Sequence, residues 1–261
     1  MRKKVKPVVI INITVCLAAA ALLFYFTRLI MDAGCFRVRD IIFKGRSTET
    51  FSYLIGKNIF DINLKKEANR LSAFYPNYKK VRLVRIIPDK IYIDFFSREP
   101  LARVRLYRDL YVDEESVFFD LPDSRAVLDL PFIYGLDKKI FAIKLGKSYN
   151  NPELAGALEI IKEIRQNKAL NNFKVKKIDL RPGADTVIFG QLFFPGDNNS
   201  RMPGNIQLFS VLEIKMSQEN IKLKIGILGS IFNHGKESLK DIKYIDLRFK
   251  EPVIKFKNAK K

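Results

Sequence analysis

The first hydrophobic pattern along the chain is an uninterrupted apolar run close to the N-terminus. Residues 8–27, VVIINITVCLAAAALLFYFT, contain no charged side chain. Twenty helical residues span about 30 Å, which is the thickness of the hydrocarbon core of a bilayer. Four basic residues precede the run, and Arg28 alone stands on its other flank. The positive-inside rule therefore predicts a transmembrane anchor at 8–30, a basic cytoplasmic tail at 1–7 and an extracytoplasmic remainder.

Two other interpretations of this segment stay open. A cleaved signal peptide has a shorter apolar core of about 7–15 residues and a small-residue cleavage site, whereas the bulky run 24–28 follows the core here. A lipoprotein would be cleaved before Cys35, but Asp32 occupies the place of the aliphatic residue that such a site needs. Cys16 lies about 28 Å from Cys35 along a helix, too far for a disulfide bond. The pattern favours the anchor.

Beyond the apolar run, short amphipathic elements predict a small α+β module at 31–100. A strand at 36–43 is followed by a short helix around 51–55, and then by a second helix for which Asn63 is the expected N-cap. Two further strands surround the turn Pro88-Asp89. The predicted order is β-α-α-β-β, and alternation predicts one shared core face for Val81, Leu83, Ile91 and Ile93.

The pattern from 101 to 257 predicts a mostly antiparallel β domain with one or two helices. One helix begins at the expected N-cap Asn151, with Pro152 in its first turn, and a short second helix is expected around 228–240. The composition of 195–204 predicts a loop, and the tail 258–261 is expected to be disordered. The predicted strands include FKVKKIDL (173–180), DTVIFGQLFF (185–194), IQLFSVLEIKM (206–216), NIKLKIGIL (220–228) and KYIDLRF (243–249).

The charge balance points to an anionic partner. Lys and Arg number 47 against 28 Asp and Glu, a formal net charge of +19. Anionic lipid headgroups, an acidic protein face and nucleic acid would all be attracted by such a chain, and solubility alone is the simplest alternative. Nucleic acid is not expected for a domain outside the cytoplasm. Lipid headgroups are the better alternative for a module that begins within a few residues of the membrane.

The sequence contains no pattern that predicts catalysis. His234 is the single histidine, and it lies in a polar stretch between glycines. The sequence has no His/Cys cluster for zinc, no G-x-S-x-G and no P-loop. The acidic run 113–115 is explained by a solvated turn, because neighbouring side chains on a strand point to opposite faces. No cofactor or metal is expected.

Five motifs follow one another in order along the chain: GKNIFDINL (56–64), VRIIPDKIYIDFFSREPLA (84–102), YVDEESVFF (111–119), LPFIYG (130–135) and YIDLRFKEPVIKFK (244–257). Their order resembles the FtsQ family of bacterial cell-division proteins, also called DivIB. The family often has glycine in the turn where this chain has Glu114-Glu115-Ser116, so the backbone of that turn is expected to differ.

This resemblance implies both a fold and a role. The module at 31–100 would be a POTRA domain, joined to the β domain by a hinge at Arg98, Glu99 and Pro100. The protein would be a non-catalytic scaffold of the division machinery, anchored in the cytoplasmic membrane at the septum. Its partners would be FtsB-like (DivIC-like) and FtsL-like single-span division proteins.

In the family the last strands of the second module bind these partners. Tyr244, Asp246, Arg248 and Phe249 occupy that region here, on a strand at 243–249 that lies near the chain end and is expected to form a sheet edge. Two other function classes remain open on the residues alone. One is a membrane-tethered envelope enzyme such as a cell-wall hydrolase, and the other is a POTRA-bearing transport factor.

Overall fold

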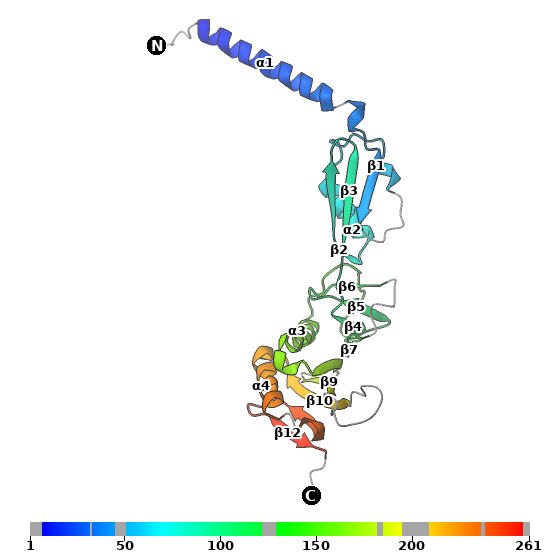
Figure 1. The fold of residues 1–261 in the computed structure, drawn as a ribbon, viewed down its shortest axis with the longest axis vertical. Helices are drawn as coiled ribbons and strands as arrows, with labels where there is room; N and C mark the ends of the chain where they lie inside the picture. Colours follow the sequence, from blue (N-terminus) through cyan, green and yellow to red (C-terminus); the bar gives the residue numbers. More distant parts are fainter. Residues whose placement is uncertain are drawn as a thin grey trace, which may run out of the picture. The chain divides into compact units, whose positions relative to one another are not determined.

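The computed structural model describes residues 7–31, 33–44, 51–121, 129–181, 185–194, 209–235 and 238–257. The chain divides into two compact units, Met1–Ser97 and Arg98–Lys261 (Figure 1). The loop expected at 195–204, the tail expected at 258–261 and residues 1–6 of the expected basic tail lie outside the described residues. The finer domain boundaries expected from the sequence stay predictions.

The N-terminal apolar run forms one long helix, α1 (Pro7–Met31). Its segment Asn12–Leu29 has a mean hydropathy of 1.6, and none of that segment is buried against the rest of the protein. The Thr27 hydroxyl donates to the Phe24 carbonyl at 2.8 Å, which satisfies the hydroxyl within the helix. By length and composition, α1 is apolar enough to cross a membrane.

The rest of the first unit is a helix packed on a small mixed sheet. Strand β1 (Asp40–Lys44) pairs in parallel with β3 (Lys90–Ser97), and β2 (Tyr78–Ile86) pairs antiparallel with β3, in the order β1-β3-β2. Helix α2 (Leu64–Phe74) covers one face of this sheet. Its core includes the four predicted positions, which are confirmed: Val81, Leu83, Ile91 and Ile93.

The two helices expected in this unit have different outcomes. Asn63 caps α2 as predicted, because its Oδ1 accepts a hydrogen bond from the Lys66 N–H at 3.0 Å. The helix expected around 51–55 is only a single 3₁₀ turn, η2 (Ser52–Leu54). Gly56, at φ +81°, follows it in the left-handed conformation that ends helices. Another 3₁₀ turn, η1 (Gly34–Phe36), follows α1.

The second unit is built on one mixed sheet of nine strands, counted over the described residues. Antiparallel pairs predominate, but β4–β7, β7–β8 and β10–β11 are parallel. The spatial order is β12-β11-β10-β9-β8-β7-β4-β5-β6. The strands are β4 (Ala102–Arg105), β5 (Asp109–Val112), β6 (Phe118–Phe119), β7 (Phe132–Tyr134), β8 (Phe173–Asp179), β9 (Asp185–Phe193), β10 (Phe209–Ser217), β11 (Ile242–Asp246) and β12 (Val253–Phe256).

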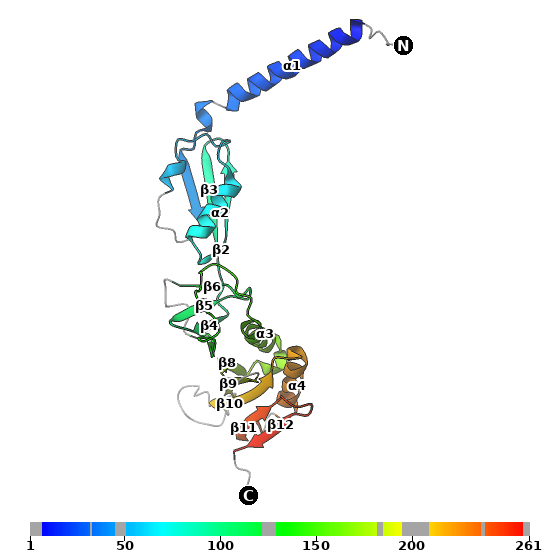
Figure 2. The same ribbon diagram turned by 180° about the vertical axis from the view of Figure 1, so that it is seen from behind.

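Two helices pack side by side on this sheet, α3 (Pro152–Gln166) and α4 (Ile221–His234), as seen in Figures 1 and 2. The predicted cap of α3 is confirmed, since Asn151 Oδ1 accepts from the Leu154 N–H at 2.9 Å. The strand predicted at 220–228 is wrong, because these residues begin α4. Their alternation also fits a helical stripe, and the buried positions are Ile221, Ile225, Leu228 and Phe232.

The six strands from β7 to β12 contain an internal repeat. The segments β7-α3-β8-β9 and β10-α4-β11-β12 both have the order β-α-β-β. In each segment the first two strands pair in parallel and the last two pair antiparallel. Strand β9 ends the first repeat and pairs with β10. Strand β12 ends the second repeat and lies at the end of the sheet.

Candidate partner-binding surface

The C-terminal strands do not form the edge in the way the sequence indicated. Strand β11 ends at Asp246 and pairs with β10 on one side and with β12 on the other. The prediction that 243–249 is an edge strand is therefore wrong, and β12 occupies the edge. Residues 247–252 reverse the chain, which lets β12 pair back antiparallel onto β11.

The β12 edge combines an open backbone with exposed apolar side chains. An edge strand presents backbone N–H and C=O groups on one side that can pair with another chain. Three large apolar side chains lie on or just before this strand and are 43–62% exposed: Phe249, Val253 and Phe256. Lys255 is also exposed. This edge can accept an extended peptide through its backbone and contact it through aromatic rings.

Tyr244 lies in the neighbouring strand and reaches the same surface. It pairs with Glu213 of β10 and Lys255 of β12, and it is half-buried. The ammonium groups of Lys215 and Lys255 lie 4.9 and 5.9 Å from its ring centroid. Such cation–π contacts hold the ring in place beside the edge. Of the predicted partner-binding residues, Tyr244 and Phe249 therefore lie beside β12 with accessible rings.

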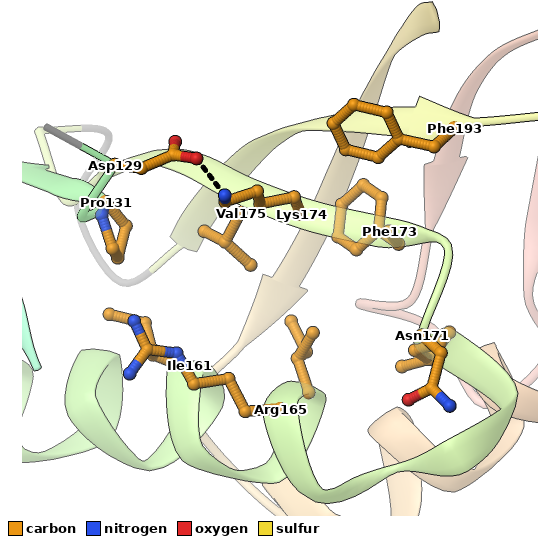
Figure 3. A pocket seen from close by; sticks show the side chains of 11 residues that line it. Asp129, Pro131, Ile161, Arg165, Asn171, Phe173, Lys174, Val175 and Phe193 are labelled. Atoms are coloured by element: carbon orange, nitrogen blue, oxygen red, sulfur yellow. Dashed lines mark hydrogen bonds and ion pairs between the residues drawn. The ribbon is translucent and has the colours of Figure 1, made fainter. Parts of the chain in front are cut away.

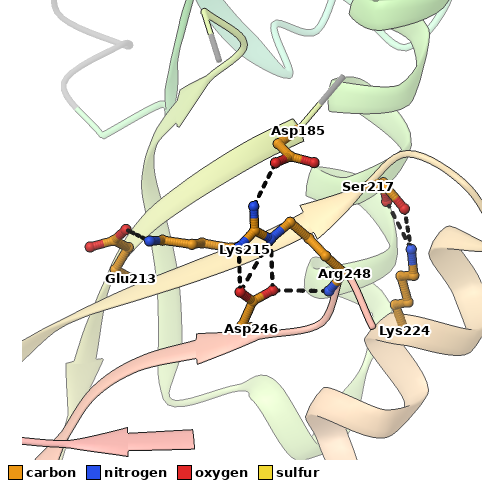
Figure 4. Close-up of polar contacts among 7 residues, drawn as sticks. All are labelled: Asp185, Glu213, Lys215, Ser217, Lys224, Asp246 and Arg248. Atoms are coloured by element: carbon orange, nitrogen blue, oxygen red, sulfur yellow. Dashed lines mark hydrogen bonds and ion pairs between the residues drawn. The ribbon is translucent and has the colours of Figure 1, made fainter. Parts of the chain in front are cut away.

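Asp246 and Arg248, the other two predicted residues, are engaged in an internal network (Figure 4). Arg248 donates from Nε to Asp246 Oδ1 at 2.9 Å and from Nη2 to Asp246 Oδ2 at 2.6 Å. Its Nη1 donates to Asp185 Oδ2 at 2.7 Å. The Arg248 side chain holds the pKa of Asp246, whose side chain is 7% exposed, below its usual range. These hydrogen bonds link the end of β11 to the start of β9.

The same arrangement occurs at the equivalent place in the first repeat. Arg181 Nε donates to Asp179 Oδ1 at 2.8 Å and its Nη2 donates to Oδ2 at 2.5 Å. The Leu180 N–H donates to the Tyr134 carbonyl in β7, and the Leu247 N–H donates to the Lys215 carbonyl in β10. The sequence signal that could have revealed this is the repeated Ile-Asp-Leu-Arg at 178–181 and 245–248. Both copies end a strand that pairs in parallel with its predecessor.

A cavity of about 300 Å³ lies between the two motifs. Asp185 faces Arg248, and Glu213 Oε1 lies 3.4 Å from Lys215 Nζ. Asp179 is paired with Lys177 at 3.1 Å as well as with Arg181. Each carboxylate in the cavity therefore has a basic partner. Its lining comprises Asp179, Asp185, Val187, Phe189, Glu213, Lys215 and Arg248.

A second cavity of about 280 Å³ lies between α3 and β8 (Figure 3). Arg165 lines it and donates from Nη2 to the Leu101 carbonyl at 3.3 Å. Asp129 binds both Lys174 and Lys176. Most of the other lining residues are apolar. Within the described residues, no group of three or more His, Cys, Asp or Glu side chains could hold a metal ion.

The predicted hinge residues stand where the second unit begins. Arg98 Nη1 lies 2.6 Å from Asp113 Oδ2 and both side chains are buried, so the solvated turn expected for the acidic run 113–115 is wrong for Asp113. Glu99 is exposed and Pro100 is half-buried. The hinge itself stays a prediction. In the turn that follows β5, Ser116 has φ +58°. This left-handed conformation favours glycine, but the residue here is a serine.

The fold and surface together define an α+β protein with one long apolar N-terminal helix, a small mixed sheet and a larger sheet whose last described strand is β12. No family model matches the chain. The chain is similar to the cell division protein FtsQ of Syntrophotalea carbinolica, with 23% identity over 199 residues. The match covers 76% of this chain and 64% of that protein, so the chain spans less than two-thirds of the relative's length. The resemblance to FtsQ predicted from the motifs is confirmed as a distant similarity.

Proposed function

We propose that this protein is a non-catalytic, single-pass membrane scaffold of the bacterial division machinery. In this proposal α1 anchors it in the cytoplasmic membrane, the first unit is a POTRA domain, and the second unit recruits division partners at the septum. The partners would be FtsB-like (DivIC-like) and FtsL-like single-span proteins. The similarity to a protein named for cell division supports the process, and the open edge at β12 supports the mode of binding.

The observation that carries the binding mode is the exposed edge itself. Among the residues that the structure describes, strand β12 pairs with β11 on one side only. Exposed, apolar edge strands invite pairing with other chains, and soluble domains usually protect them. Here Val253 and Phe256 stand exposed on the edge strand, with Phe249 just before it. A partner that adds a strand would satisfy the backbone and cover these side chains.

The internal repeat supports a direction for the incoming strand. In the first repeat, the outer side of β9 is occupied by β10, which runs antiparallel to it. On the corresponding side of β12, no strand of the described part of the chain pairs with it. An incoming segment that follows the same geometry would run antiparallel to β12. Like β10, whose Leu212, Ile214 and Met216 are buried, it would carry apolar side chains at alternate positions.

Site-specific photo-crosslinking tests this surface. A photoreactive amino acid in place of Lys255 on β12 should capture an FtsB-like or FtsL-like partner in dividing cells. The matched control is Lys222, which is 75% exposed on α4 and away from the edge. In parallel, Phe249→Ala and Phe256→Ala should weaken partner capture about tenfold, because aromatic anchors at the centre of an interface contribute about 2 kcal/mol or more. Val211→Ala, an exposed position on β10, should leave capture unchanged.

Two results would overturn the proposal. Equal crosslinking from Lys255 and Lys222 would place the interface away from β12. If native cells depleted of the protein still form normal septa, the protein has no role in division. Filaments with unfinished septa are the expected phenotype.

A further inference from the structure

Two loops of the first unit meet at the point where the chain enters its sheet. The Val38 N–H donates to the Lys57 carbonyl at 2.9 Å, and the Gly56 N–H donates back to the Val38 carbonyl at 2.8 Å. The Arg39 N–H donates to the Asp89 carbonyl at 2.8 Å. The loop 55–57 and the β2–β3 turn 87–89 are thereby fixed to the same short segment that leads into β1. We call this end of the sheet the entry end.

The entry end exposes aliphatic side chains. Ile55 is 51% exposed, Ile86 is 40% exposed and Ile87 is 63% exposed, and Pro88 beside them is also exposed. Single exposed apolar residues need no explanation, but a group of them gathered at one end marks a contact surface. Ile91, the second residue of β3 at this end of the sheet, is fully buried. Ile55 and Ile87 lie in loops and Ile86 is the last residue of β2, so the exposed group lies at the end of the sheet and is not part of its core.

Basic residues lie at the same end of the sheet as this aliphatic group. Arg37, Arg39, Lys57 and Lys90 stand at the entry end together with two carboxylates, Asp40 and Asp89. Lys90 Nζ lies 3.5 Å from Asp40 Oδ2, and Arg39 Nε lies 3.9 Å from Asp89 Oδ2. Four basic groups against two acidic ones leave a positive excess, and the Arg39 side chain remains 71% exposed. Aliphatic tips within a basic rim suit the boundary of an anionic bilayer.

The length of chain after α1 brings this end within reach of a membrane. Seven residues lead from Met31, the last residue of α1, to Val38. Val38 is held in place by its backbone hydrogen bonds with Lys57 and Gly56. Seven extended residues span at most about 25 Å. The 3₁₀ turn Gly34–Phe36 shortens that reach, because such a helix rises only about 2 Å per residue. The connection therefore keeps the entry end within about 25 Å of the point where α1 leaves a bilayer.

We propose that the entry end is a second membrane contact, in which Ile55, Ile86 and Ile87 insert at the headgroup–acyl boundary and the basic rim binds anionic phospholipid headgroups. This inference rests on the proposed role of α1 as an anchor. The contact restricts how the first unit can turn about the short connection to α1. The unit then stands on the bilayer with the opposite end of its sheet, where β2 begins, directed away from the lipid.

Depth-dependent fluorescence quenching in the full-length protein tests the contact. Cys16→Ala and Cys35→Ser remove the native thiols, and Ile87→Cys then receives an environment-sensitive dye. The protein is reconstituted into nanodiscs of phosphatidylglycerol and phosphatidylcholine that carry a shallow nitroxide-labelled lipid. The matched control is Phe74→Cys, because Phe74 is 68% exposed and lies where α2 ends, at the far end of the sheet. The dye at position 87 should be blue-shifted and quenched, and the dye at position 74 should not.

Charge neutralisation tests the headgroup part of the same contact. Arg37→Gln, Arg39→Gln and Lys57→Gln together should reduce quenching at position 87 several-fold, because each basic side chain at an anionic surface changes binding about fivefold. Nanodiscs made of phosphatidylcholine alone should also reduce the quenching at position 87. Lys79→Gln and Lys80→Gln, near the start of β2, should change nothing. Unchanged far-ultraviolet circular dichroism of each variant keeps the comparison valid.

A dye at position 87 as exposed to water as the dye at position 74, with α1 still resistant to carbonate extraction, would overturn this inference. Such a result would indicate that the entry end binds a protein partner and not lipid. Partner capture at β12 would be unaffected by it. Loss of partner capture with normal quenching at position 87 would instead reject the proposed function and keep the membrane contact.

Discussion

Arg98 Nη1 lies 2.6 Å from Asp113 Oδ2, and the two side chains are only 8% and 7% exposed. Asp113 Oδ1 also accepts hydrogen bonds from the N–H groups of Glu115 and Val117, at 2.9 and 3.0 Å. One carboxylate thus joins the first residue of the second unit to the turn that follows β5. The residue expected to act as a hinge is held firmly on the side of the second unit.

Removing one member of this buried pair should be strongly destabilising. We expect Arg98→Met to lower the free energy of unfolding by about 3–5 kcal/mol, because it leaves a buried carboxylate without its basic partner. Urea denaturation of the full-length protein in detergent measures the change. Arg108→Met is the control, since its ion pair with Asp120 is about half exposed and should contribute less than about 1 kcal/mol. Equal effects of the two substitutions would show that burial of Arg98 is not what matters.

The Ile-Asp-Leu-Arg motifs predict an acid-sensitive second unit. Hydrogen bonds from Arg248 and Arg181 lower the pKa values of Asp246 and Asp179 in the folded state. A group with a lowered folded pKa stabilises the fold above its unfolded pKa of about 4, and this contribution is lost as the pH falls through the folded pKa. Stability should therefore fall progressively below about pH 4.

Asp246→Asn tests this pH dependence. The variant should be about 1.5–3 kcal/mol less stable at neutral pH, because it loses a charge-assisted hydrogen-bond pair. Its stability should also change less than that of the parent between neutral and acidic pH. Denaturant midpoints measured across that range give both quantities. A variant whose acid dependence parallels the parent's would exclude Asp246 as a source of the effect.

Gly190 in β9 lies against the ring of Phe173 in β8. A Cβ at position 190 would collide with that ring and lie 2.9 Å from the Lys174 carbonyl oxygen. We expect Gly190→Ala to destabilise the protein by about 1–3 kcal/mol through overpacking. Gly226→Ala is the matched control, because nothing lies within 4 Å of a Cβ there and alanine favours the α4 helix by about 0.5–1 kcal/mol. Thermal unfolding should therefore move in opposite directions for the two variants.

Ser116 pays a conformational cost in its turn, since φ is +58°. Ser116→Gly should raise the free energy of unfolding by about 0.5–1 kcal/mol. The left-handed conformation costs a residue with a Cβ about 1–2 kcal/mol, and glycine avoids this cost. Part of that gain is offset because glycine loses more backbone entropy on folding. Ser116→Val should act in the opposite direction, since branching at Cβ makes this conformation worse. A decrease in melting temperature for Ser116→Gly would contradict the assignment.

Local sequence signals determined much of the architecture. The uncharged run in α1 exceeds any ordinary helix in length and hydropathy, so its identity as one apolar helix follows from composition. Asn63 and Asn151 cap helices as predicted, because a cap is a contact between residues three positions apart. The core face of β2 and β3 follows from strict alternation, which only a strand satisfies.

Tertiary structure decided what local patterns could not. The run 220–228 satisfies both a two-residue and a helical period, and it forms α4 because the sheet offers its apolar stripe a face to cover. Asp246 and Arg248 alternate along the sequence as surface residues would, yet Asp246 is buried, and Arg248, whose side chain is 33% exposed, binds both Asp246 and Asp185. Whether β11 or β12 forms the sheet edge depends on pairing between segments distant along the chain. Pairing of that kind is fixed by the whole sheet, and no single strand's sequence contains it.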